Sequence, residues 1–97
     1  MKNGEVLHII ARPKMGAFDL VSQAITDMSV LSVELFEGQN FSYKMELGAR
    51  GRNSVGVRYL FNEPHQRKQF VENQKFQSAL LDLHMNCRRG SKLKVSV

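Results

Sequence analysis

Arginine and lysine side chains are the residues of this sequence whose type and spacing most clearly indicate chemistry. They form three clusters in the second half of the chain. The clusters are Arg50, Arg52 and Arg58; Arg67 and Lys68; and Arg88, Arg89, Lys92 and Lys94. Guanidinium and ammonium groups bind phosphate oxygens, so this pattern predicts a surface that contacts a polyanion.

The charge of the chain is distributed unevenly. Residues 1–47 carry four basic and six acidic side chains, a net charge of −2, whereas residues 48–97 carry ten basic and three acidic side chains, a net charge of +7. The whole chain has a formal net charge of +5 at pH 7. Such an asymmetry favours nucleic acid, either DNA or RNA, as the partner.

Two of the clusters lie where we expect a functional surface. The loop GARGRN, residues 48–53, places Arg50 and Arg52 among glycines, where backbone N–H groups and guanidinium groups suit phosphate oxygens. An ordinary solvated hairpin loop is the alternative. Arg67 and Lys68 lie in the first turn of a predicted helix, where the helix dipole disfavours cations. We expect the binding surface to centre on these four side chains.

The third cluster has a structural explanation as well as a functional one. In CRRGSKLKVSV, residues 87–97, Arg88 and Arg89 follow a predicted helix end, where cations gain about 0.3–1 kcal/mol each from the dipole. Gly90 is typical of the position just past a helix, and lysines in a last strand discourage edge-to-edge association. Contact with phosphates is compatible with both roles. The predicted nucleic-acid-binding residues are Arg50, Arg52, Arg58, Arg67, Lys68, Arg88, Arg89 and Lys92.

Aromatic side chains alternate along two neighbouring predicted strands. They are Phe41 and Tyr43 on the first strand and Tyr59 and Phe61 on the second. The opposite faces carry polar side chains such as Lys44 and Arg58, so we expect the aromatic side chains to face the helices and not to stack on bases.

No pattern in the sequence predicts catalysis or a metal site. His84 and Cys87 are three residues apart on one predicted helix, but a structural zinc site needs further ligands. Glu34 and Glu46 lie on the polar faces of adjacent predicted strands, where a surface pair is the commoner explanation than two-metal chemistry. We therefore expect a protein that is not an enzyme and that holds neither a metal nor a cofactor.

Hydrophobic periodicity predicts the elements that carry these residues. The expected order is a strand (5–11), a helix (17–28), three strands (30–37, 41–47 and 54–61), a helical segment from residue 62 to about 87, and a last strand within GSKLKVSV (90–97). Phe76, Leu80 and Leu83 form a core-facing stripe in the second helical segment, which either bends near Asn73 or divides there into a short and a longer helix.

The segment VLHIIARPKMGAFDLVSQAITDMSVLSVELF, residues 6–36, is similar to the first half of an ACT-type ligand-binding domain. The likeness consists of a strand, a loop with proline and glycine, an amphipathic helix and a second strand. The compact Asp-Arg-Pro-Gly loop of that family is interrupted here, because Lys14 and Met15 separate Pro13 from Gly16. The resemblance implies ferredoxin-like topology.

Together these patterns predict one α+β domain over residues 1–97. Its five-stranded, mainly antiparallel sheet carries two helices on one face, in a ferredoxin-like arrangement with one added strand. The other face is either exposed to solvent or the interface of a homodimer. Non-catalytic, regulatory nucleic-acid binding is the leading function, and the alternative is a small inhibitor or adaptor that docks an acidic protein. The short apolar runs predict no membrane span, and the lone Cys87 favours the cytoplasm.

Overall fold

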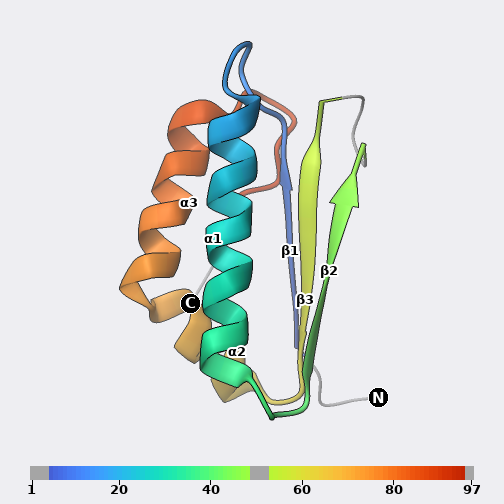
Figure 1. Ribbon diagram of the computed structural model, residues 1–97, viewed down its shortest axis with the longest axis vertical. Coiled ribbons are helices and arrows are strands. Elements are labelled where there is room, and N and C mark those ends of the chain that lie inside the picture. The colour runs from blue at the N-terminus through green and yellow to red at the C-terminus, as the bar shows by residue number, and fades with distance from the viewer. Residues whose placement is uncertain (1–4, 49–52, 96–97) are drawn as a thin grey trace.

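The computed structural model describes residues 5–48 and 53–95, which form a sheet covered on one face by helices (Figure 1). The elements, in chain order, are β1 (Glu5–Ala11), α1 (Phe18–Phe36), β2 (Phe41–Leu47), β3 (Val55–Phe61), α2 (Pro64–Glu72) and α3 (Gln74–Asn86). The strands are antiparallel and lie in the order β1-β3-β2. In the described part of the chain, no helix is long and apolar enough to cross a membrane.

The core lies between the sheet and the helices and is centred on β3. Alternate residues of this central strand point toward the helices, and Val57, Tyr59 and Phe61 are completely buried there. Phe76 and Leu83 of α3 close the core from the other side, as the helical stripe in the sequence predicts. Aromatic rings fill much of the space, and those of Tyr59 and Phe70 lie 4.9 Å apart.

The strand predicted over residues 30–37 is wrong, because this segment is the second half of α1. Its apolar residues Leu31, Val33 and Leu35 alternate with the polar Ser32 and Glu34, which is typical of a strand. Leu31, Ser32 and Phe36 nevertheless continue the buried face of the helix, while Val30 is 52% exposed. Helix propensity is a weak preference, so the buried face decides the structure of the segment.

The last predicted strand is reduced to a single bridge beside β1. Residues Ile10 and Lys92 exchange two backbone hydrogen bonds, with N–O distances of 3.0 and 2.7 Å. A second isolated bridge joins Pro13 and Cys87, and the turn that contains Gly90 at φ 92° lies between the two bridges. The described chain thus has a three-stranded sheet, and the predicted five-stranded sheet is wrong.

The second helical segment divides into a short and a longer helix at Asn73, which is one of the two outcomes that its sequence predicts. The described chain therefore has three helices, and the prediction of two is wrong. Asn73 has φ −68° and ψ 135°, and its side-chain oxygen accepts a hydrogen bond of 2.8 Å from the backbone N–H of Lys75. It therefore ends α2 and caps the start of α3. The described chain holds three helices on a ferredoxin-like sheet, and the final segment runs beside β1 where a fourth strand would pair.

Candidate functional site

The open face of the sheet carries a charged cluster at its centre. Register places Glu46 beside Gly56, and Gly56 beside Ile10. Because Gly56 has no side chain, the Glu46 carboxylate reaches across β3 to His8, with 2.8 Å between His8 Nε2 and Glu46 Oε1. Arg58 Nε lies 3.6 Å from the other carboxylate oxygen.

Both neighbours favour the ionised form of the Glu46 carboxyl. The hydrogen bond to His8 is the main cause of a lowered pKa, with the charge of Arg58 a smaller contribution. Glu34, which the sequence placed on an adjacent strand, lies on α1 instead, on the covered side of the sheet. The two carboxylates are therefore not a pair, and the possibility of a two-metal site between them does not arise from this fold.

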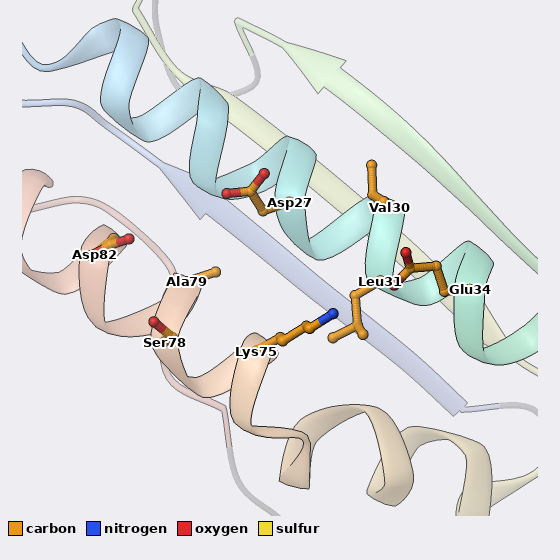
Figure 2. Close-up of a pocket in the computed structure, with 8 residues that line it drawn as sticks. All are labelled: Asp27, Val30, Leu31, Glu34, Lys75, Ser78, Ala79 and Asp82. Atoms are coloured by element: carbon orange, nitrogen blue, oxygen red, sulfur yellow. The ribbon is translucent and has the colours of Figure 1, made fainter.

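A first groove runs between α1 and α3 and has a volume of about 350 Å³ (Figure 2). Val30, Leu31 and Ala79 supply its apolar surface. Its polar lining consists of Asp27 and Glu34 from α1 and Lys75, Ser78 and Asp82 from α3. Figure 2 shows Lys75 extending from α3 toward α1, among three carboxylates that are spread along the groove. The groove is thus acidic in a chain whose net charge is positive.

A second groove lies between the end of α1 and the edge strand β2, with a volume of about 320 Å³. Val33, Phe36, Phe41 and Tyr43 form its apolar lining. The remaining lining residues are Glu37, Gly38, Gln39 and Ser42. Because no helix covers the edge strand completely, Tyr43 is 41% exposed although it points to the helical side of the sheet. This aromatic groove has the composition of small-molecule sites, which are mainly apolar with few polar groups.

A buried pair of hydroxyl groups lies next to this groove. The Ser29 hydroxyl is 3.0 Å from the Tyr59 hydroxyl and 3.7 Å from the sulfur of Met45. Burial raises the pKa of the Tyr59 phenol far above its usual value. The phenol is therefore a neutral hydrogen-bonding group in the interior and not a base.

Among the residues that the structure describes, the basic side chains predicted to bind nucleic acid do not form one surface. Arg58 is on the open face of the sheet with Glu46, and Lys68 is on α2, with its ammonium group 3.9 Å from the Glu72 carboxylate. Arg67 also lies on α2. Figure 1 shows α2 at one end of the molecule and the segment after α3 at the other.

The remaining predicted residues follow α3 or lie outside the description. Arg88 and Arg89 come directly after the helix, and Lys92 makes the bridge to β1. Arg50 and Arg52 lie outside the described residues. His84 and Cys87 line one hollow after α3, but the described residues contain no group of three His, Cys, Asp or Glu side chains arranged for a metal ion. Burial raises the pKa of the Cys87 thiol.

The aromatic groove was not anticipated from the sequence. Val33 and Phe36 were assigned to a strand, so their proximity to Tyr43 was missed. The signal was present in the spacing of Met28, Leu31 and Leu35, which continues the helical period of the preceding segment.

No family model matches this chain, and no curated protein matches it in sequence. Solved structures of similar fold do exist. A conserved protein from Methanosarcina mazei superposes with a TM-score of 0.76 at 8% identity, over 93% of this chain and 87% of that one. A protein from Nitrosomonas europaea, provisionally named an antibiotic biosynthesis monooxygenase, gives 0.72 at 11% identity, over 90% of each chain. A NIPSNAP family protein from Agrobacterium tumefaciens gives 0.61 at 14% identity, over 95% of this chain and 82% of that one.

These likenesses define the fold as that of the antibiotic biosynthesis monooxygenase and NIPSNAP type, and at these identities they define the fold alone. They overturn the nucleic-acid-binding function predicted from the charge, because proteins of this fold named for small-molecule chemistry are the neighbours of the chain. The adaptor alternative likewise finds no support among them. The error has a physical cause: net charge reports how a protein attracts ions and says little about its fold or site.

Proposed function

We propose that this protein is a small ligand-binding domain whose site is the aromatic groove between α1 and β2. The observation that carries the proposal is the exposed ring of Tyr43 beside the half-buried ring of Phe41. Their centroids are 6.3 Å apart and their planes differ by 30°. The ring centroid of Phe36 lies 5.2 Å from that of Phe41, so the buried Phe36 ring supports the Phe41 ring from the core. The groove therefore has a pre-formed aromatic wall on which an apolar ligand can stack.

The polar groups of the groove define what else the ligand carries. Gln39 lies at the rim, where its side-chain oxygen accepts a hydrogen bond of 2.9 Å from Gln66. The exposed hydroxyl of Ser42 remains available to a ligand. We propose an uncharged, mainly apolar molecule with one hydrogen-bonding group, because the lining contains only one charged residue, Glu37.

The acidic groove between α1 and α3 fits this role less well. Three carboxylates line this groove beside its apolar surface. An uncharged ligand bound there would remove water from these carboxylates without replacing the hydrogen bonds that the water makes. The proposal is one of binding without a catalytic step. The names of the structural neighbours support small-molecule recognition by this fold, and the oxygenation that those names state belongs to those proteins.

The experiment uses 2-naphthol as the probe and follows backbone amide chemical shifts in a titration. We expect saturable shifts at Val33, Gln39 and Tyr43, and about tenfold weaker binding by Tyr43→Ala, since aromatic stacking contributes about 0.5–1.5 kcal/mol beyond apolar burial. Leu81→Ala is the matched control, because Leu81 is an exposed apolar residue on α3, away from the groove. Shifts that centre on Asp27 and Lys75 would transfer the site to the acidic groove. Appearance of an oxidised product under air would show that the protein is an enzyme.

We propose further that the open sheet face pairs with a second copy of the chain. No helix of the described chain covers this face (Figure 1), and the cross-strand neighbours Val6 and Leu60 are each about half exposed on it. A two-fold dimer would bury the same apolar pair from both copies. Sedimentation should show a dimer for the native chain and a monomer for Leu60→Glu. If the native chain is still a monomer at about 100 μM, a concentration at which even weak dimers form, the dimer proposal is contradicted.

The lone Cys87 supports a reducing compartment, and we propose the cytoplasm.

A further inference from the structure

Two hollows meet at Arg88, just after the end of α3. The first has a volume of about 230 Å³ and is lined by Pro13, Lys14, Met15, Gly16, Phe18, Asn53 and Arg88. The second, of about 400 Å³, is lined by His84, Cys87, Arg88, Arg89, Gly90, Ser91, Leu93 and Lys94. No aspartate or glutamate contributes to either set, in contrast to the three carboxylates of the groove between α1 and α3. Arg88 is the residue common to both hollows, and Lys14, Arg89 and Lys94 are further cationic residues that line one or the other.

The backbone beneath Arg88 is held on two sides. Its N–H donates a hydrogen bond of 2.8 Å to the carbonyl of Arg12, and its carbonyl accepts one of 2.8 Å from the Ser91 hydroxyl. The same hydroxyl accepts the N–H of Arg12 at 2.9 Å. Two segments far apart in the sequence are therefore tied together at this point. Arg88 projects from a braced turn and not from a free chain end.

Two other cationic residues, Lys14 and Arg12, already bind backbone carbonyls at and just after the carboxyl end of α3. Lys14 donates its backbone N–H to the carbonyl of Asn86 at 2.8 Å and its ammonium group to that of Met85 at 3.1 Å. The guanidinium of Arg12 donates to the carbonyl of Arg89 at 3.4 Å. Helix-end stabilisation, the structural role that the sequence assigned to Arg88 and Arg89, is thus supplied by residues from the other side of the fold.

The side chains of Arg88 and Arg89 are left with neither a hydrogen bond nor an ion pair among the described residues. Arg88 and Arg89 both line the second hollow, and an anion bound there would reduce the repulsion between their positive charges. Cys87 does not oppose an anion here, since burial raises the pKa of its thiol and keeps the sulfur uncharged.

We infer that Arg88 is the centre of an anion-binding site for a small phosphorylated molecule, with Lys14 lining the first hollow and Arg89 the second. The planar guanidinium group can bind two phosphate oxygens at once, and the second hollow leaves room for a further phosphate beside Lys94. A diphosphate therefore fits the site better than a single phosphate. The site is distinct from the aromatic groove, so either can fail without the other.

The test is a titration with sodium pyrophosphate at low salt, followed by backbone amide shifts and by calorimetry. We expect one saturable site, shifts concentrated at residues 12–14 and 87–91, and weaker binding of inorganic phosphate than of pyrophosphate. Arg88→Ala should weaken pyrophosphate binding by about tenfold or more, because it removes a charge-assisted, two-point contact. Arg88→Lys should restore part of the affinity, since it retains the charge but not the planar fork.

Lys68→Ala is the matched control, because Lys68 is an exposed cation on α2 at the other end of the molecule. It should bind pyrophosphate as the native chain does, and both variants should keep the native circular dichroism. The inference is overturned if sodium chloride at equal ionic strength produces the same shifts. It is also overturned if Lys68→Ala weakens binding as much as Arg88→Ala, because the effect would then be that of net charge alone.

Discussion

Glu46 on β2 and His8 on β1 are hydrogen-bonded across the intervening strand, with 2.8 Å between Oε1 and Nε2. Residues on non-adjacent strands meet in this way because Gly56, the register partner of Glu46 on the intervening strand β3, has no side chain. A Cβ on Gly56 would lie 3.3 Å from the Glu46 oxygen and 3.1 Å from the carbonyl of Ile9. The glycine is thus a condition for the charged cluster at the centre of the open face.

This relationship predicts a pH dependence of stability. The pKa of the Glu46 carboxyl is lowered in the folded state from 4.5, mainly by the hydrogen bond to His8. A depressed pKa means that the carboxylate adds stability above the unfolded-state value and that this stability is lost as the pH falls through the folded-state value. Glu46→Gln should lower the free energy of unfolding at pH 7 by less than about 1 kcal/mol, as for a partly exposed pair. It should also reduce the loss of this free energy as the pH falls below about 4.5.

Chemical denaturation at pH 7 and pH 3 measures both effects. Glu72→Gln is the control, because its ion pair with Lys68 is long and exposed and should contribute almost nothing. Equal pH profiles for the two variants would show that the His8–Glu46 bond has no energetic role.

The helical stripe of α3 predicts a large cost for removing core side chains. Leu80 is buried against the core cluster, so Leu80→Ala should lower the free energy of unfolding by about 2–5 kcal/mol. Leu81, one residue further on, is 59% exposed, and Leu81→Ala should change it by less than about 0.5 kcal/mol. Similar values for the two substitutions, measured by urea denaturation, would mean that the buried face of α3 is misassigned.

The length of α1 can be tested at Val30, which would lie in a strand if the periodicity of residues 30–37 decided the structure. In a helix, exposed Val30→Ala should leave the free energy of unfolding unchanged or raise it by about 0.5 kcal/mol, because alanine has the higher helix propensity. Val30→Pro should lower it by about 3 kcal/mol or more, since it removes a hydrogen bond within the helix. Thermal unfolding followed by circular dichroism checks both. A clear loss of stability in Val30→Ala would favour the strand.

The buried Ser29–Tyr59 pair predicts that Ser29→Ala and Tyr59→Phe lower the free energy of unfolding by different amounts. The Ser29 hydroxyl has a second partner in the carbonyl of Ile25 at 3.1 Å, so Tyr59→Phe leaves it satisfied. Ser29→Ala leaves the Tyr59 hydroxyl buried without this partner. We expect a cost of about 1–3 kcal/mol for Ser29→Ala and a smaller one, about 0.5–1.5 kcal/mol, for Tyr59→Phe. Equal or reversed costs in denaturant titrations would contradict the expectation that the buried Tyr59 hydroxyl depends on Ser29 for its hydrogen bond.

The same burial predicts how the protein responds to alkali. The pKa of Tyr59 is raised in the folded state above its usual value of 10.0, so the stability that its neutral form supplies is present below that value and is lost as the pH rises beyond it. In a Tyr43→Phe variant, in which Tyr59 is the remaining tyrosine, the ultraviolet absorbance of the ionised phenol should appear together with unfolding. Ionisation near pH 10 in a protein that keeps its circular dichroism would show that the phenol is accessible.

Local patterns in the sequence determined several features of this protein by themselves. The alternation in residues 41–47 and 54–61 predicts two strands, and both form. One face of β3 is buried in the core, as the alternation requires. The stripe of Phe76, Leu80 and Leu83 specifies α3 for the same reason, and the polar Asn73 interrupts it with a side chain suited to capping. These features depend on neighbours close in the chain, so the sequence alone was sufficient to find them.

Tertiary packing decided the rest. Residues 30–36 alternate like a strand but are helical, because Leu31, Ser32 and Phe36 reach the core only from a helix. Their new position creates the groove beside Tyr43, which no local pattern describes. The side chain of Arg88 is likewise left without a partner among the described residues because Lys14, more than seventy residues away in sequence, binds the last carbonyls of α3 in its place. Charge can be counted along a chain, but which cations are already engaged is decided by contacts between distant segments.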